Sequence, residues 1–295
     1  MAFADILKTF KKPPDNGGVL AKLDRYLLSL DGKLLKNKAD ERAQNCYHPS
    51  ELSTNPCIRS MTYKWLKTPA TNGSTIQPRV KRIFDTGHHF GFIIQQYFWD
   101  MDILEGNYEC ACGHEWWAVS PRTCPSCEKE LEIWKNLFYK EVPVHNEAWN
   151  IIGHSDGIIH LGGERVVIEL KSIKNRDAKT GENAVCFEDL SAAKLEHVYQ
   201  TNLYMDALGI DRGIIIYFAK NTQEMKEFPI RRMDLMLQPS YQKIVAVNQA
   251  LMQGELPERA GRIKSDPMCT YCGFKDYCWG SDHTFEEADF RKGGN

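Results

Sequence analysis

The stretch GHSDGIIHLGGERVVIELKS, residues 153 to 172, decides the fold. Its run of β-branched residues at 166 to 168 is typical of a buried strand. The pair Gly162-Gly163 suits a two-residue hairpin turn, in which both residues need positive φ angles. We therefore expect two antiparallel strands, at 150 to 160 and at 164 to 173, joined by these glycines.

Charged residues within the second strand predict a site. Alternation places Glu169 and Lys171 on one face of the strand and Ile168 and Leu170 on the other. A buried charge must be paired, bound to a metal or turned into a cleft, because unpaired burial is costly. The hairpin brings Asp156 beside Glu169, and two convergent carboxylates favour Mg²⁺ or Mn²⁺. The alternative is a structural ion pair between Glu169 and Lys171.

The flanking segments predict a mixed α/β fold. Short apolar runs predict further strands at 137–146, 213–219 and 224–230, and helical periodicity predicts helices at 19–37, 57–67, 79–100, 191–208 and 239–253. We expect Ser191 as an N-cap, Gly209 just after the end of the same helix, and Pro239 at a first helical position. These helices would flank a central sheet.

Composition indicates a soluble globular protein. Of 295 residues, 42% are apolar and 26% charged, and no apolar run is long enough to span a bilayer. Because the N-terminus lacks a signal-peptide pattern, we expect a cytoplasmic protein with no membrane partner. The net charge of −2 argues neither for nor against nucleic-acid binding. Residues 52 to 84, however, contain six basic and no acidic side chains. This basic segment, which includes Arg59 and Lys64, either contacts a phosphate backbone or forms a solvated surface of the protein.

Ten cysteines in a reducing compartment indicate metal ligands rather than disulfides. Two close pairs have the spacing of a zinc ribbon with four thiolates: Cys110, Cys112, Cys124 and Cys127. Such a zinc ion is structural, since four thiolates leave no open position. A later group supplies three ligands of a second centre, Cys269, Cys272 and Cys278, and its fourth ligand is to be sought among Cys46, Cys57 and Cys186.

Three motifs together carry a resemblance to a known family. G-x-x-D-G at 153–157, E-L-K at 169–171 and Q-x-x-x-Y at 200–204 closely resemble the PD-(D/E)xK nucleases of the RecB type. The resemblance extends to HPSELSTNPCIRSMTYKWL at 48–66 and to the late cysteines, and it covers about residues 47–104 and 137–280. It implies a restriction-endonuclease-like α/β core and a metal-dependent DNA exonuclease.

The resemblance also implies roles for individual residues. Asp156, Glu169 and the Leu170 carbonyl would bind the metal, and Lys171 would be the catalytic lysine. Gln200 and Tyr204 would contact DNA and support the site, and Arg59 and Lys64 would be further DNA contacts. The family usually has a metal-binding histidine four residues after a glycine, but here Gly91 stands four residues after Gly87. We expect His88 as its substitute, with His89 second.

For the late cysteines, the resemblance implies a [4Fe–4S] cluster with Cys57 as fourth ligand, although thiolates alone suit zinc as well. The cluster would fasten both flanks of the chain to the core. The expected organisation is a helical region at 1–104, an inserted zinc ribbon at 105–132, a catalytic core at 133–265 and an iron–sulfur segment at 266–295.

The expected partner is DNA, either single-stranded or at its ends. Because no P-loop motif is present, a helicase would be a separate partner, as would a polymerase or a single-strand-binding protein. The resemblance points to a bacterial or archaeal host, to phage-encoded relatives and to DNA replication, recombination or repair. Two rivals stay open: an inactive DNA-binding or assembly protein on the same fold, and a structure-specific endonuclease.

Overall fold

A computed structural model describes residues 19–29, 45–70, 77–176, 185–270 and 272–280. The chain divides into two compact units, Met1–Ala43 with Gly73–Thr86, and Gln44–Asn72 with Gly87–Asn295. In the first unit, α2 (Val19–Ser29) is joined to the first turns of α6 (Pro78–Asp100) by an ion pair between Asp24 and Arg82 at 2.5 Å. The rest of the helix predicted at 19–37 lies outside the described residues.

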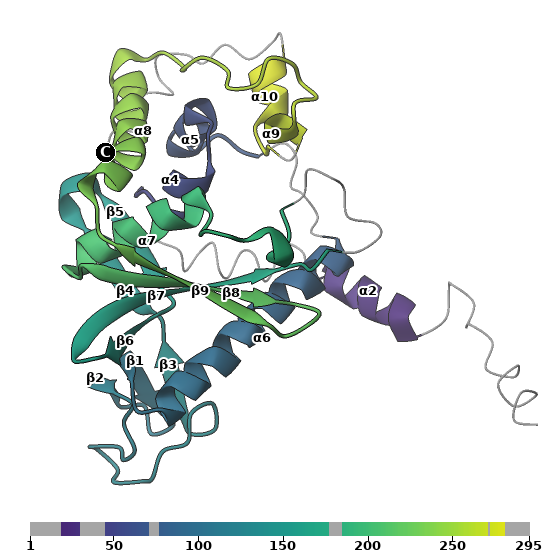
Figure 1. The fold of residues 1–295 in the computed structure, drawn as a ribbon. Helices are drawn as coiled ribbons and strands as arrows, with labels where there is room; N and C mark the ends of the chain where they lie inside the picture. Colours follow the sequence, from purple (N-terminus) through teal and green to yellow (C-terminus); the bar gives the residue numbers. More distant parts are fainter. Residues whose placement is uncertain (1–18, 30–44, 71–76, 177–184, 271, 281–295) are drawn as a thin grey trace, which may run out of the picture. The chain divides into compact units, whose positions relative to one another are not determined.

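A seven-stranded sheet forms the centre of the second unit (Figure 1). Its order is β2-β1-β6-β7-β8-β9, and β3 pairs with β1. The bounds are β1 (Leu104–Cys110), β2 (Glu115–Val119), β3 (Leu137–Lys140), β6 (Gly157–Leu161), β7 (Glu164–Ile173), β8 (Arg212–Ala219) and β9 (Met225–Arg231). The sheet is mostly antiparallel, and β7 with β8 is its parallel pair.

The predicted hairpin is present. Leu161 pairs with Glu164, so Gly162 and Gly163 form the turn, with φ angles of +61° and +80°. Two positive φ angles are what a type I′ turn requires, and glycine adopts them without strain. The β-branched residues of β7 lie in the core, where Val167 is completely buried.

Two predicted strands are each broken into two. The segment 137–146 divides at Glu141 into β3 and β4 (Val142–Asn146), and 150–160 divides at Asp156 into β5 (Ile151–Ser155) and β6. Strands β4 and β5 form a separate two-stranded sheet, in which Val142 pairs with Ser155. Both breaks occur where the chain passes from one sheet to the other. Glu141 directly precedes Val142 and Asp156 directly follows Ser155, so both residues lie next to the last pair of the β4–β5 ladder.

Helices cover both faces of the central sheet, as predicted (Figure 1). On one face α7 (Leu195–Leu208) contacts β4, β7 and β8. On the other face, α6 from Gly87 onward packs Phe98 and Trp99 into the cluster that contains Ile168. Beyond α7 lie α4 (Pro49–Thr54), α5 (Ile58–Trp65) and α8 (Asp234–Gln253), which share a second apolar cluster.

The shorter helices complete the described elements. They are η1 (Glu147–Trp149), η2 (Phe187–Asp189), α9 (Pro267–Thr270) and α10 (Lys275–Trp279). The ring of Tyr63 on α5 contacts Phe274 at 5.5 Å and Tyr277 at 6.5 Å, which places the C-terminal segment against α5. Within the described residues, no helix combines the length and the apolar character that crossing a membrane requires.

Two helix starts differ from the prediction. Helix α7 begins after Lys194 and not after Ser191, because the extended Lys194 donates its backbone N–H to the Tyr217 hydroxyl at 2.9 Å. Helix α8 begins at Asp234, so Pro239 lies inside it rather than at its first position. The Asn202 side chain accepts the N–H of Met233 at 2.9 Å and thereby fixes this earlier start. The Gly209 end of α7 is confirmed, with φ +64°.

The segment predicted as an inserted module, 105–132, is continuous with the central sheet. Its strand β1 pairs with β6 at Leu104 and Glu105, and then with β3 and β2. The loops that contain its cysteines extend from the far end of β1. The domain division drawn from the sequence stays a prediction, but β1 belongs structurally to the sheet.

Candidate active site and metal centres

Asp156 lies at the junction of β5 and β6 and is held from two sides. Its Oδ2 accepts the backbone N–H of Leu170 on β7 at 2.6 Å. Its backbone carbonyl accepts Nε2 of Gln95 on α6 at 2.8 Å. Gln95 is buried, and its Oε1 has no hydrogen-bond partner in the described part of the chain. The carboxylate is thus fixed in position beside an acceptor that a bound water can satisfy.

Glu169 and Lys171 lie on the face of β7 that α7 covers. Val167, two residues before Glu169, packs with Tyr204 and Met205 of α7, which confirms the predicted alternation. Glu169 is 1% exposed and forms an ion pair through Oε1 with Nζ of Lys171, whose side chain is 28% exposed. The ammonium therefore neutralises the deeper carboxylate from the solvent side.

Burial perturbs both carboxyl groups, and repulsion between carboxylates adds to the effect on Glu169. Burial raises the pKa of Glu169 to about 8, and the charges of Asp156 and Glu141 add to the effect, while Lys171 opposes it. Burial also raises the pKa of Asp156, against the opposing effects of Lys171, the Leu170 N–H and His88. Acids that resist ionisation beside each other are a favourable environment for a divalent cation, whose charge removes the repulsion.

The main chain of Leu170 lies at an edge of β7 that β6 leaves open. Pairing of β6 with β7 ends at Ile168, whereas β8 continues along the other edge to Ile173. The N–H of Leu170 points to Asp156, and in a strand the C=O of the same residue points to the same side. Two carboxylates and one carbonyl, all hard oxygen donors, fit Mg²⁺ or Mn²⁺.

The predicted histidines are less closely placed. His88 and His89 are exposed on α6. His88 lowers the pKa of Asp156 through its charge, whereas His89 contacts the ring of Phe92 at 6.1 Å. Of the two, His88 is thus the one that acts on the carboxylates. Among the described residues, His88, Asp156 and Glu169 do not form a group with all ligand atoms within 4.8 Å of one another.

Gln200 and Tyr204 lie on the buried side of α7, next to the site. Nε2 of Gln200 donates to the Tyr204 hydroxyl at 2.7 Å, and both side chains are buried. Burial, followed by the charge of Glu169, raises the pKa of Tyr204 well above its usual value. Because the hydroxyl accepts from Gln200, its own proton remains available for another acceptor. The geometry suits support of the carboxylates better than a direct surface for DNA.

The predicted DNA contacts Arg59 and Lys64 have internal partners. Arg59 donates to the Pro257 carbonyl at 2.7 Å and to the Tyr63 hydroxyl at 3.2 Å. Lys64 is exposed and pairs with Glu51 at 2.5 Å. Part of the positive charge of this basic segment is therefore used within the protein, and a role for either residue in binding DNA stays a prediction.

Four sulfur atoms at the end of β1 form a group that could hold a metal ion. The Sγ atoms of Cys110, Cys112, Cys124 and Cys127 all lie within 4.8 Å of one another. Two of the S···S separations, Cys110 to Cys127 and Cys112 to Cys124, are 3.8 Å. A tetrahedral zinc ion with Zn–S bonds of about 2.3 Å requires sulfurs about 3.8 Å apart. Two of the separations thus match a tetrahedral thiolate site, and the group could hold a metal ion.

Backbone turns hold these cysteines. The N–H of Gly113 returns to the Cys110 carbonyl at 2.8 Å, and that of Glu128 to the Cys124 carbonyl at 2.9 Å. Burial acts to raise the pKa of Cys124, but backbone N–H groups of Cys127 and Ser126, with neighbouring thiols, lower it to about 7. N–H groups that face a sulfur stabilise its thiolate, which is the form that binds a metal.

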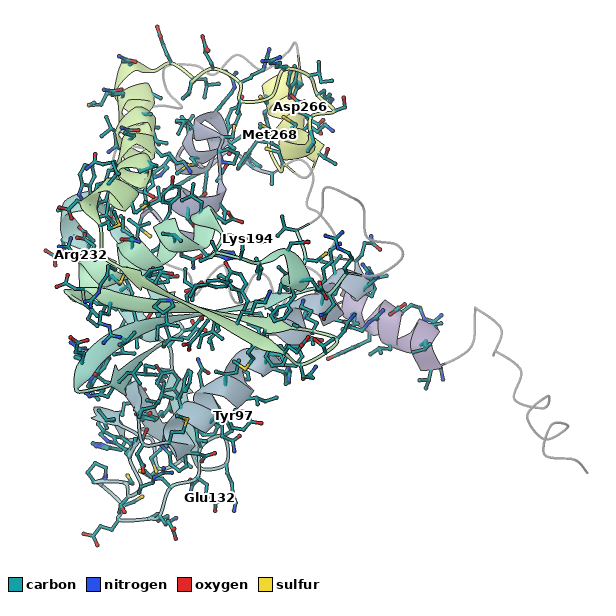
Figure 2. All side chains as sticks on the ribbon, in the orientation of Figure 1. Tyr97, Glu132, Lys194, Arg232, Asp266 and Met268 are labelled. Carbon is teal, nitrogen blue, oxygen red and sulfur yellow. The ribbon has the colours of Figure 1, made fainter. Side chains whose placement is uncertain are left out.

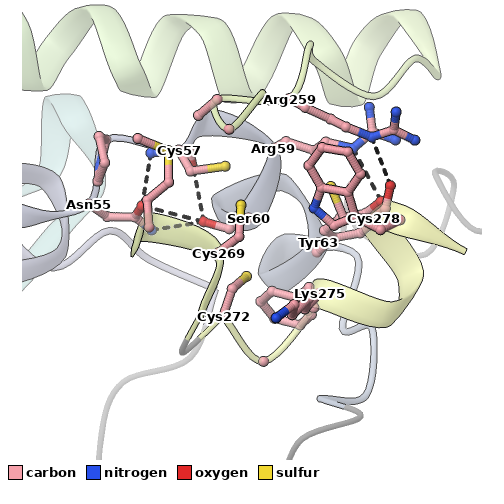
Figure 3. A pocket seen from close by; sticks show the side chains of 17 residues that line it. Asn55, Cys57, Arg59, Ser60, Tyr63, Arg259, Cys269, Cys272, Lys275 and Cys278 are labelled. Atoms are coloured by element: carbon pink, nitrogen blue, oxygen red, sulfur yellow. Dashed lines mark hydrogen bonds between the residues drawn. The ribbon is translucent and has the colours of Figure 1, made fainter. Parts of the chain in front are cut away.

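The C-terminal cysteines and Cys57 line one cavity of about 290 Å³ (Figure 3). Cys57 precedes α5, and Cys269, Cys272 and Cys278 come from the segment containing α9 and α10. Burial raises the pKa of Cys272, and the charges of the other three thiols add to it. Their sulfurs are not gathered like those at β1. The other two candidates for the fourth ligand, Cys46 and Cys186, are buried elsewhere and do not line this cavity.

Three residues near the carboxylates were not predicted. They are Gln95, Glu141 and His197. A signal existed for Gln95, because Gly87, Gly91 and Gln95 recur every four residues on one side of α6. Glu141 carried no local signal, since its position depends on the break between β3 and β4.

Comparison with known proteins gives distant structural similarities only. No protein-family model matches the chain, and no curated protein does. The crystal structure of SSO0001 aligns with 89% of this chain and 97% of its own, at 16% identity and a TM-score of 0.43. The alkaline exonuclease LHK-Exo from Laribacter hongkongensis covers 39% of this chain and 57% of its own, at 16% identity and a TM-score of 0.30.

LHK-Exo in complex with dAMP covers 71% of this chain and 89% of its own, at 10% identity and a TM-score of 0.38. These scores and identities are low, so a function has to be inferred from the geometry of this chain. Membership of the RecB-type iron–sulfur nucleases stays a prediction.

The raised pKa of Glu169 predicts how stability depends on pH. Between about pH 4.5 and 8 the folded chain binds this proton more tightly than the unfolded chain does, so the metal-free protein loses stability as pH rises through that window. We expect Glu169→Gln to flatten this slope, measured by urea unfolding at pH 5 and pH 8 in the presence of a chelator. Mn²⁺ added at pH 8 should stabilise the wild type more than the variant.

Glu147→Gln is the matched control, because Glu147 is exposed on η1 and should leave the slope unchanged. An identical slope in the Glu169→Gln variant and the wild type would contradict the assignment.

The four-cysteine group predicts a second measurable effect. Cys112→Ser removes an exposed thiolate, and we expect the zinc content, measured by mass spectrometry of the digested protein, to fall by one equivalent per chain. The melting temperature should fall with it. Ser126→Ala, in the turn between Cys124 and Cys127 but without a ligand atom, should retain the metal. Equal zinc in Cys112→Ser and the wild type would exclude this centre.

Proposed function

We propose that the chain is a metal-dependent DNA nuclease. The observation that carries the proposal is the convergence of Asp156, Glu169 and Lys171 around the unpaired edge of β7. A structural ion pair alone explains Glu169 and Lys171, but it does not explain why Asp156 is directed onto the Leu170 N–H at the same place. Two acids with raised pKa values beside a lysine are typical of a functional site.

The proposed ligands of Mg²⁺ or Mn²⁺ are Asp156, Glu169 and the Leu170 carbonyl, with His88 as a further candidate. When bound, such an ion neutralises charge on a phosphoryl oxygen and lowers the pKa of a bound water. The reaction is hydrolysis of a phosphodiester: the water oxygen bonds to phosphorus, one P–O ester bond breaks, and the leaving oxygen takes a proton.

Lys171 supplies positive charge in this proposal. Although burial lowers its pKa, Glu169 and Asp156 together raise it above the usual value, so the side chain is an ammonium at neutral pH. An ammonium can orient the attacking water and stabilise negative charge on the phosphate, but it cannot accept a proton. Gln200 and Tyr204 support the carboxylates from α7.

We further propose that the cavity lined by Cys57, Cys269, Cys272 and Cys278 holds a [4Fe–4S] cluster. Its volume of about 290 Å³ suits a cluster of several atoms better than a single ion. Arg59, Arg259 and Lys275 also line it and would offset the charge of four thiolates. The cluster would link α5 to the C-terminal segment.

An exonuclease acting on single-stranded DNA or DNA ends is the form we favour, within bacterial, archaeal or phage DNA metabolism and alongside a separate helicase, polymerase or single-strand-binding protein. An endonuclease needs the same chemistry with a different DNA geometry. The exposed position of His88 favours the inactive DNA-binding rival, because that residue is not gathered with the carboxylates.

Cleavage assays test the proposed reaction. End-labelled linear DNA and circular DNA, single- and double-stranded, are incubated with Mn²⁺ and either the wild type or Lys171→Met. We expect the wild type to degrade linear DNA and the variant to be slower by roughly 10²- to 10³-fold, because it lacks the cation beside the phosphate. Lys135→Met removes an equal charge near the cysteine loops and should retain activity.

Failure of the wild type to cleave any substrate would exclude the enzyme. If circular DNA is cut as rapidly as linear DNA, the enzyme is an endonuclease and not an exonuclease.

Spectroscopy tests the proposed cluster. Protein purified without oxygen should be coloured and contain about four irons per chain, whereas Cys57→Ser should lose both colour and iron. Cys46→Ser is the matched control, since Cys46 lies outside the cavity and should leave the iron content unchanged. A colourless protein with two zinc ions per chain would refute the cluster.

A further inference from the structure

His197 extends the functional face of α7 by one turn. His197, Gln200 and Tyr204 are spaced i, i+3 and i+7, so they lie along one side of the helix. Tyr204 interacts with Glu169, and His197 interacts with the charge of Lys171. The helix therefore follows β7 across the site and ends near the catalytic lysine with a partly buried imidazole.

Tyr217 fixes this imidazole. Tyr217 lies on β8 at the position paired with Lys171 on β7, and its side chain is completely buried. Its hydroxyl accepts the backbone N–H of Lys194 at 2.9 Å and lies 2.7 Å from Nδ1 of His197. Figure 2 shows Lys194 at the beginning of α7. One buried hydroxyl thus connects the start of the helix with the histidine ring.

The hydrogen bond with Tyr217 determines the tautomer of His197. Among the described residues, the only acceptor in reach of the buried Tyr217 hydroxyl proton is Nδ1 of His197. A buried O–H without an acceptor is costly, so Tyr217 donates and Nδ1 accepts. In a neutral imidazole the proton then resides on Nε2. Within the described part of the chain, Nε2 has no hydrogen-bond partner.

The charges around the ring keep it neutral. Burial lowers the pKa of His197 to about 3, and the charges of Lys171 on β7 and Lys194 before α7 add to the effect. A neutral imidazole with a fixed N–H is a donor that does not change with pH in the working range. The Lys194 ammonium adds positive charge beside the ring, whereas that of Lys171 is shared with Glu169, and added positive charge of this kind attracts an anion.

We propose that His197 is a further phosphate-binding residue of the site, which donates its Nε2–H to a non-bridging oxygen of the phosphodiester on the Lys171 side. This inference rests on the proposed nuclease function. The ligand chemistry is a phosphate oxygen, because the position combines the Lys194 ammonium, the Lys171 ammonium that Glu169 shares, and one neutral donor. Tyr217 is a positioning residue, since it acts on the phosphate only through His197.

Side-chain replacements separate the two nitrogens of the ring. His197→Gln places an amide N–H near the position of Nε2, whereas His197→Asn keeps a polar group near Nδ1 for Tyr217 but does not reach the phosphate. We expect His197→Asn to lower kcat/KM by roughly 10- to 100-fold, the effect of one hydrogen bond to a charged group, and His197→Gln to retain most of it. Tyr217→Phe should cause a smaller loss.

The pH profile of the loss and the affinity for DNA distinguish a phosphate-binding role of His197 from a purely structural one. The loss in His197→Asn should be the same factor from pH 6 to pH 9, because the imidazole is neutral throughout. Binding of labelled single-stranded DNA in Ca²⁺ should weaken without a change in its salt dependence. Lys194→Gln should instead reduce the slope of log K against log salt by about 0.7, the value for one lost phosphate contact.

Melting temperatures establish that each variant is folded, and His145→Asn, at an exposed histidine on β4, is the control that should match the wild type. Wild-type kcat/KM and DNA affinity in folded His197→Asn would overturn the inference, as would a loss that varies with pH. A wild type without any nuclease activity would overturn the proposed function instead. If His197→Asn does not fold, a tenfold or greater loss in folded His197→Gln would overturn the donor role.

Discussion

The structure depends on the burial of charge in a strand whose centre is apolar. Glu169 is 1% exposed, so its carboxylate can exist there only with a compensating cation. Lys171 supplies that cation from the same face of the same strand, and Asp156 is held close by through the Leu170 N–H. A carboxylate pair with a single lysine is left short of positive charge. The shortage leaves this site open to further positive charge.

The division of the strands into two sheets positions that cluster. In one continuous strand made of β5 and β6, the backbone of Asp156 would form hydrogen bonds within the sheet and its side chain would lie on one face of the sheet. Instead the chain bends at Asp156, just after Ser155 pairs with Val142. The bend frees the edge of β7 beyond Ile168, where the Leu170 N–H and C=O point to the carboxylate. An interruption in regular structure thus brings Asp156 to the main chain of β7.

The sequence predicted local features better than it predicted boundaries set by distant contacts. The Gly162-Gly163 hairpin and the inward side of β7 follow from turn chemistry and alternation, which are properties of neighbouring residues. The start of α8 depends on Asn202, and the start of α7 on Tyr217, neither of which a local pattern reveals. The four thiols at β1 were predictable because metal ligation imposes close spacing, whereas the histidine near Asp156 has no such constraint.

The parallel pairing of β7 with β8 has a consequence for how the site is assembled. The hairpin of β6 and β7 closes over two residues, but Lys171 pairs with Tyr217 only across a long stretch of chain that contains α7. Closing such a loop costs entropy before its contacts repay it. We therefore expect the hairpin to form early with its carboxylates still hydrated. Their desolvation, which is costly for a charged group without a partner, is then deferred until α7 and β8 supply those partners.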